Sequence, residues 1–203
     1  LKAAKADLAF RRGLGVTVDL ISADELQRLE PGLPVEGGGG AFFPNARFMS
    51  DPGAMVAKLA ESAARRGASY RRAEVRSLEH DVAGVRLGGE GLALHARHVV
   101  LATGAHGRGL ARQAGDRVPL DTERGYHITL GGFAPRFSIP IASYERKVIM
   151  TPMSCGLRMT GTVEFGGLRL PPDEGRFELL KRHMNALTGN VSTENASTWM
   201  GFR

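Results

Sequence analysis

One glycine follows a continuously apolar stretch at a point where the chain could approach a ligand. Residues 99–102 are all apolar, as expected of a strand covered on both faces, and Gly104 then turns the chain into an expected helix over residues 108–114. The amide N–H groups at the start of such a helix suit phosphate oxygens. The segment favours dinucleotide binding, although most glycines after a buried strand only form the turn.

Other sequence motifs that carry chemistry are missing. The chain has no Gly-x-Gly-x-x-Gly fingerprint, because the glycines of residues 104–109 have a different spacing, and it has no Walker A loop and no Gly-x-Ser-x-Gly. The six histidines show no pairing with cysteine or carboxylate at ligand spacing, so we expect no metal site. Cys155 is the single cysteine and has no base beside it in the sequence. No catalytic acid, base or nucleophile is therefore assigned.

Hydrophobic periodicity and capping residues predict which elements position the glycine turn. Helices are expected over residues 2–12, 22–29, 53–66, 108–114 and 173–187. Strands are expected over residues 16–21, 68–72, 75–80, 85–87, 92–96, 99–102, 125–130, 147–153 and 157–165, with a strand end at 42–44. The order of these elements indicates an α/β substructure interleaved with a largely antiparallel one.

Composition limits the classes of protein. The chain of 203 residues is 42% hydrophobic and should be globular. Its net charge of +6 comes from scattered basic residues without a nucleic-acid-binding motif, so we expect no nucleic acid partner. No apolar run is long enough for a transmembrane segment. Because residue 1 is a leucine within an expected helix, the chain is expected to begin inside a fold.

Several separate motifs occur together in one order. They are residues 39–44, 101–104, 118–127, 150–153, 156–165 and 199–203. In this order the chain resembles the D-amino acid dehydrogenase branch of the DAO flavoprotein family over nearly its whole length. The resemblance implies FAD as cofactor.

The resemblance also implies a fold of the α+β or α/β class. A partial FAD-binding, Rossmann-like domain would be interleaved with a mixed, largely antiparallel substrate-domain sheet. Residues 1–50 and 118–200 would belong to the substrate domain, residues 51–117 to the FAD domain, and residues 201–203 would begin the return to the FAD domain. The first and last parts of the family's cofactor domain would be missing, so we expect the chain alone to be inactive.

Five residues take expected roles from the resemblance. Val75 matches the residue whose backbone contacts the adenine of FAD. Ala102, Thr103 and Gly104 match the segment that runs beside the ribose and pyrophosphate. Arg203 matches the arginine whose guanidinium pairs with the substrate carboxylate.

Three further positions lie near the expected substrate pocket. Related oxidases place polar or aromatic residues where Ile149 stands, which leaves the substrate open. Tyr126 and His127 lie in the same region of the sequence and are taken as structural.

The implied reaction is oxidation of a small amino acid at its α-carbon, with hydride transfer to the flavin and an electron acceptor that the sequence does not identify. The alternatives are a glycine, sarcosine or hydroxyproline oxidoreductase of the same family, or a non-catalytic binding module. The protein is expected in the cytoplasm, with association with the inner face of the membrane as an alternative.

Overall fold

The computed structural model describes residues 2–34, 38–132, 137–189 and 191–202. The chain divides into two compact units. Unit 1 comprises Leu1–Pro52, Tyr126–Thr162 and Asp173–Trp199, and unit 2 comprises Gly53–Gly125, Val163–Pro172 and Met200–Arg203. The expected assignment of the chain to a substrate domain and a FAD domain stays a prediction.

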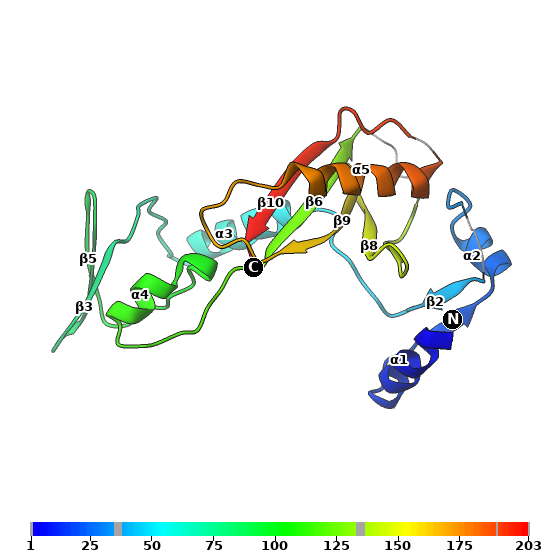
Figure 1. Ribbon diagram of the computed structural model, residues 1–203. Coiled ribbons are helices and arrows are strands. Elements are labelled where there is room, and N and C mark those ends of the chain that lie inside the picture. The colour runs from blue at the N-terminus through cyan, green and yellow to red at the C-terminus, as the bar shows by residue number, and fades with distance from the viewer. Residues whose placement is uncertain (1, 35–37, 133–136, 190, 203) are drawn as a thin grey trace. The chain divides into compact units, whose positions relative to one another are not determined.

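The elements follow one another as labelled in Figure 1. The helices are α1 Lys2–Gly13, α2 Ala23–Leu29, α3 Pro52–Arg65, the 3₁₀ turn η1 Gly104–His106, α4 Arg108–Gln113 and α5 Glu174–Thr188. The strands are β1 Asp19–Ile21, β2 Gly40–Phe42, β3 Ser77–Asp81, β4 Gly84–Gly89, β5 Leu92–Ala96, β6 Arg124–Gly131, β7 Ile141–Ser143, β8 Val148–Met153, β9 Gly156–Glu164 and β10 Ser197–Phe202.

The first part of unit 1 is held together by local capping and by one buried carboxylate. Ser22 and Glu25 form a capping box that starts α2, as the sequence predicts. Glu30, at the end of α2, is 1% exposed. Its carboxylate accepts hydrogen bonds from the backbone N–H and hydroxyl of Ser138 and from the N–H of Ile139. A buried carboxylate with these donors links α2 to a segment more than 100 residues away.

A five-stranded sheet in the order β10-β6-β9-β8-β7 is the largest element of the chain. In unit 1, helix α5 lies across one face of this sheet (Figure 1). The residues buried between helix and sheet are Tyr126, Ile128, Val148, Met150, Leu157, Met159, Phe177, Leu180 and Met184. Since successive side chains of a strand point to opposite faces, the residues between them lie on the sheet's second face.

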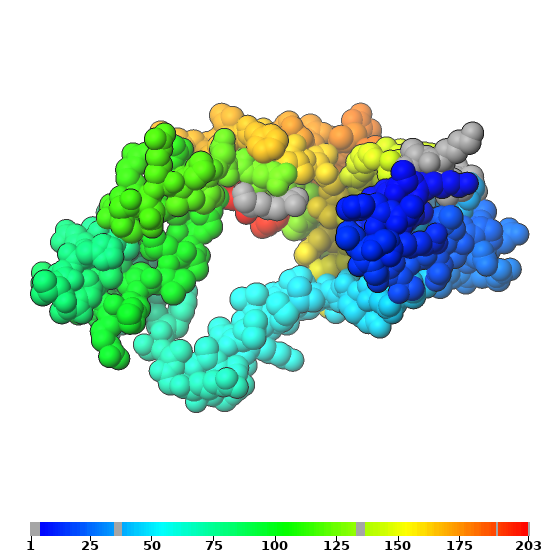
Figure 2. Space-filling view, turned by 90° about the horizontal axis from the view of Figure 1, so that it is seen from below, coloured from blue at the N-terminus to red at the C-terminus, as the bar shows by residue number. Residues whose placement is uncertain are grey.

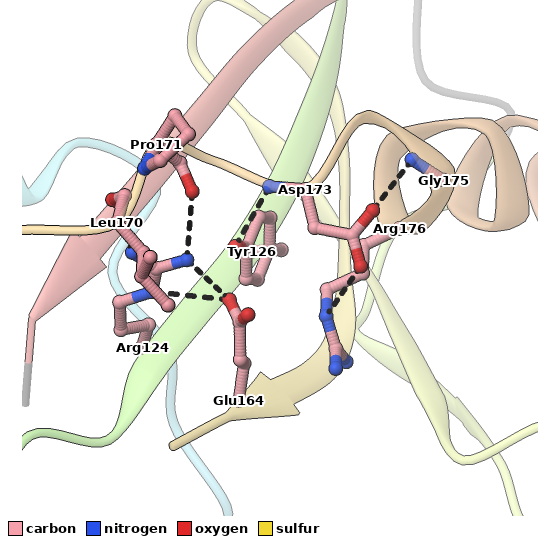
Figure 3. A network of polar contacts seen from close by, with 8 residues as sticks. All are labelled: Arg124, Tyr126, Glu164, Leu170, Pro171, Asp173, Gly175 and Arg176. Carbon is pink, nitrogen blue, oxygen red and sulfur yellow. Dashed lines mark hydrogen bonds and ion pairs between the residues drawn. The ribbon is translucent and has the colours of Figure 1, made fainter. Parts of the chain in front are cut away.

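The first turn of α5 is fixed to the sheet through a tyrosine. The hydroxyl of Tyr126 accepts a hydrogen bond from the N–H of Asp173, and its ring meets the ring of Phe177 edge-on, with centroids 5.2 Å apart. Asp173 in turn caps α5 by accepting from the N–H of Gly175 and lies 3.4 Å from Arg176 (Figure 3). Tyr126 is therefore a packing residue, which agrees with the structural role expected for it.

A buried arginine organises part of unit 2. The guanidinium of Arg124 is fully buried and donates from Nε to Glu164 at 3.0 Å and from Nη2 to the carbonyl of Pro171 at 2.9 Å. A further bond goes to the carbonyl of Leu170 (Figure 3). A Cβ on Gly166 would lie 2.8 Å from the guanidinium carbon, so only glycine leaves room for the arginine there.

Unit 2 also contains a three-stranded antiparallel meander, β3-β4-β5, as the sequence predicts. Helix α4 is attached to β3 by the side-chain amide of Gln113. This amide accepts from the N–H of Leu78 at 2.8 Å and donates to the carbonyl of Arg76 at 3.1 Å. Helix α3, by contrast, buries none of its residues among the described part of the chain.

Two predicted strands are wrong. Residues 68–72 and 99–102 form no strand in the structure. Val100 is 87% exposed, so the second segment is not covered on both faces as its apolar run indicates. A buried strand needs a hydrogen-bonded neighbour on each side, and the described residues supply none for this segment.

The strands β7 and β10 were missed by the sequence reasoning, because a three-residue edge strand and a strand with a glycine near its end carry little periodicity. Among the described residues, none of the helices has the length and apolar character needed to cross a membrane.

Candidate functional site

The residues expected to hold FAD lie together in unit 2. Ala102, Thr103 and Gly104 are all exposed. Gly104 has a φ of +54°, and a Cβ placed on it would meet nothing within 4 Å. The backbone at this turn is therefore open to a group that approaches it closely, which fits the expected contact with a dinucleotide.

The apolar segment before this turn is extended and alternates in exposure. Val100 points outward, whereas its two neighbours line a hollow. The hollow is lined by Leu78, His80, Val85, Val99, Leu101, Ala114 and Asp116. Side chains of residues 99–101 therefore alternate in direction as in a β-strand, although this segment has no strand paired with it among the described residues.

Val75 precedes the residue that accepts a hydrogen bond from Gln113. It is half-buried and directly precedes Arg76, whose carbonyl accepts from Gln113. Gln113 ends α4, and α4 follows the Gly104 turn. One side-chain amide thus connects the two segments expected at the adenine and at the pyrophosphate. The sequence reasoning missed Gln113, because its partners are 35 and 37 residues away.

Arg203, the residue expected to pair with a substrate carboxylate, lies outside the described residues. Its predicted role is therefore not tested by the geometry. The strand that leads to it, β10, is described, and in the space-filling view from below β10 (red) and β6 (light green) both reach the surface (Figure 2).

The second face of the five-stranded sheet, opposite α5, gathers polar and aromatic side chains. We define this second face in unit 1 by His127 and Thr129 of β6, Ile149 of β8, Arg158 of β9 and Trp199 of β10. On β8, Ile149 is 44% exposed between the buried Val148 and Met150. The second face is therefore accessible at β8 and at Trp199, which is 55% exposed.

An aromatic pair occupies one end of this face. The imidazole of His127 stacks on the indole of Trp199, with centroids 4.7 Å apart and an angle of 19° between the rings. Burial of the half-buried imidazole, followed by the positive charge of Arg158, lowers the pKa of His127 to about 4. His127 is therefore neutral at physiological pH and supplies a hydrogen-bonding ring without a charge. The sequence analysis took this residue as structural and did not anticipate its position on an accessible face.

The low pKa of His127 makes the stability of the protein pH-dependent. In the unfolded chain His127 has the ordinary pKa of histidine, 6.5, and is protonated below that pH. In the folded protein it is protonated only below about pH 4. Stability is then lost as the pH falls from 6.5 to 4. Because the imidazole is half-exposed, we expect this loss in the free energy of unfolding to be about 1–2 kcal/mol.

Urea denaturation of the complete gene product and of His127→Gln at pH 7, 5.5 and 4.5 measures this loss. Between pH 7 and 4.5 the free energy of unfolding of the variant should fall by about 1–2 kcal/mol less than that of the parent. His183, whose pKa is also lowered by burial, contributes equally to both proteins. Parallel pH profiles would contradict the assignment.

The sequence of the whole chain is similar to that of known flavoproteins. The family model described as FAD dependent oxidoreductase, DAO, matches residues 1–203. A D-amino-acid oxidase of Bradyrhizobium diazoefficiens is 36% identical over 96% of this chain and 47% of its own length.

Solved structures share the fold. Glycine oxidase from Geobacillus kaustophilus superposes with a TM-score of 0.82 at 24% identity, covering 96% of this chain and 53% of that protein. L-proline dehydrogenase from P. horikoshii gives a TM-score of 0.78 at 18% identity, covering 99% and 56%. The chain thus spans about half the length of the relatives that it matches, and the expected fold class is confirmed.

Proposed function

The chain belongs to the DAO family of FAD-dependent oxidoreductases, and from this premise we propose that it is part of an enzyme that oxidises an amino acid at its α-carbon. The observation that carries the proposal is the family match over every residue of the chain, together with 36% identity to a D-amino-acid oxidase. A D-amino acid is therefore the first substrate class to test.

The turn at Ala102–Gly104 fits the cofactor. Its backbone is exposed, Gly104 adds no side chain, and Gln113 holds the following helix to the strand after Val75. We assign Val75 to the adenine and Ala102, Thr103 and Gly104 to the ribose and pyrophosphate. When bound, FAD supplies the chemistry by accepting a hydride from the substrate's α-carbon.

The protein's own contribution is to orient the substrate. We assign the α-carboxylate to Arg203, because a guanidinium binds a carboxylate through two parallel hydrogen bonds and so fixes the direction of the Cα–H bond. No side chain needs to act as acid or base if the amine binds uncharged. The cytoplasmic location stays a prediction.

Spectroscopy and turnover of the complete gene product test this function. We expect the purified protein to carry stoichiometric yellow flavin and to reduce a dye acceptor with D-alanine. Turnover on sarcosine, glycine and hydroxyproline instead would favour the related oxidoreductases. A protein without flavin and without turnover would favour a non-catalytic binding module. The 203-residue chain expressed alone should be silent, and stoichiometric flavin in it would contradict that expectation.

A further inference from the structure

A pair of aromatic rings joins the end of β10 to the turn that we assign to FAD. The imidazole of His106 and the ring of Phe202 have their centroids 5.4 Å apart and their planes at 81°, which is an edge-to-face arrangement. His106 ends η1 and Phe202 ends β10. Both residues lie in unit 2, as does the whole segment from Ala102 to Gly104, so the contact is internal to one compact unit.

The backbone ties His106 to this turn. Its N–H donates to the carbonyl of Thr103 at 3.2 Å, and the N–H of Gly107 donates to the carbonyl of Gly104 at 3.0 Å. A Cβ on Gly107 would lie 2.5 Å from the hydroxyl oxygen of Thr103, so η1 packs closely against the turn. Any restraint on the His106 ring therefore also restrains the backbone of Thr103 and Gly104.

The ring pair is the directed interaction between η1 and β10. The described residues form no hydrogen bond or ion pair that joins these two elements. His106 is exposed and Phe202 is 37% exposed, so neither ring is held by burial in a core. The contact is favourable because the positive edge of one ring meets the negative face of the other.

We propose that the His106–Phe202 pair couples the binding of FAD to the ordering of the end of β10, and that His106 is a positioning residue for the cofactor turn. The proposal rests on the proposed function, in which FAD contacts the open backbone from Ala102 to Gly104. FAD bound there would restrict the turn, and the ring pair would extend this restriction to the end of β10. Coupling is reciprocal, so a restrained β10 should in turn strengthen the binding of FAD.

Hydrogen exchange in the complete gene product, with and without FAD, tests the coupling in the unaltered protein. We expect FAD to slow exchange of the amides of residues 200–202 in the parent, and this slowing should be lost in His106→Ala. His106→Phe should restore it, because a phenyl ring can make the same edge-to-face contact. Unchanged exchange at residues 200–202 when FAD is added to the parent would overturn the proposal.

The dissociation constant of FAD, followed by flavin fluorescence, provides a second readout. His106→Ala and Phe202→Leu should each raise this constant roughly 2- to 10-fold, because each removes the ring contact. The double variant should show little further rise, since the contact is already lost in each single variant. His98→Ala removes an exposed histidine of the same unit that makes no ring contact among the described residues, and it should leave the constant unchanged.

A ring pair with a purely structural role would give a different result. In that case the variants would lower the free energy of unfolding of the protein without FAD and leave the dissociation constant of FAD at the parent value, which would overturn the proposal. Additive increases in the double variant would also overturn it, since each ring would then act by itself. A gene product that binds no FAD would instead contradict the proposed function, on which the coupling depends.

Discussion

Replacing Arg124 with methionine is expected to lower the free energy of unfolding of the complete gene product by about 3–5 kcal/mol. The guanidinium is fully buried and donates to Glu164 and to the carbonyls of Leu170 and Pro171. Its removal takes the donors of a fully buried guanidinium away from the Glu164 carboxylate and from two carbonyls. Urea denaturation followed by circular dichroism measures the change.

The partner of Arg124 provides the control. If the loss comes from the Glu164 carboxylate once Arg124 is gone, the double variant Arg124→Met, Glu164→Leu should recover part of the stability, because two apolar side chains can replace a buried ion pair. Arg86→Met, which removes an exposed arginine paired with Asp81 in the same unit, should change stability little. A double variant less stable than Arg124→Met would show that the two carbonyls, and not Glu164, account for the loss.

If Arg203 binds the α-carboxylate as proposed, replacing it with leucine is expected to lower kcat/KM on the preferred amino acid roughly 100- to 1,000-fold, because two charge-assisted hydrogen bonds would be lost. Steady-state kinetics of the complete gene product test this. Arg203→Lys should fall between the parent and Arg203→Leu, since an ammonium keeps the charge but not the planar fork.

The flavin content of these variants separates substrate binding from folding. Arg203→Leu should retain the flavin spectrum of the parent, and its turnover should fall on D-glutamine and D-glutamate alike. Unchanged kcat/KM in Arg203→Leu would contradict the assignment of the α-carboxylate to Arg203.

Elements with local signals were predicted well from the sequence. The capping box at Ser22 and the N-cap at Asp173 start α2 and α5 where expected, because a cap depends on residues two or three positions apart. The meander β3-β4-β5 was also predicted, since its strands are joined by turns with Gly84 and Gly91 in conformations that favour glycine. Family membership was predicted because several motifs kept one order along the chain.

Features that depend on distant segments were decided only by the tertiary structure. Residues 99–102 are apolar enough for a buried strand, but a strand requires neighbours that no local pattern supplies, and the described chain gives it none. The contacts of Glu30, Gln113 and Arg124 each join residues at least 35 positions apart. The second face, with His127, Arg158 and Trp199, exists because three strands far apart in sequence pair in one sheet. The sequence thus determined the family and the elements that carry local signals. The pairing of distant strands decided which side chains share a face, since that pairing depends on non-local burial.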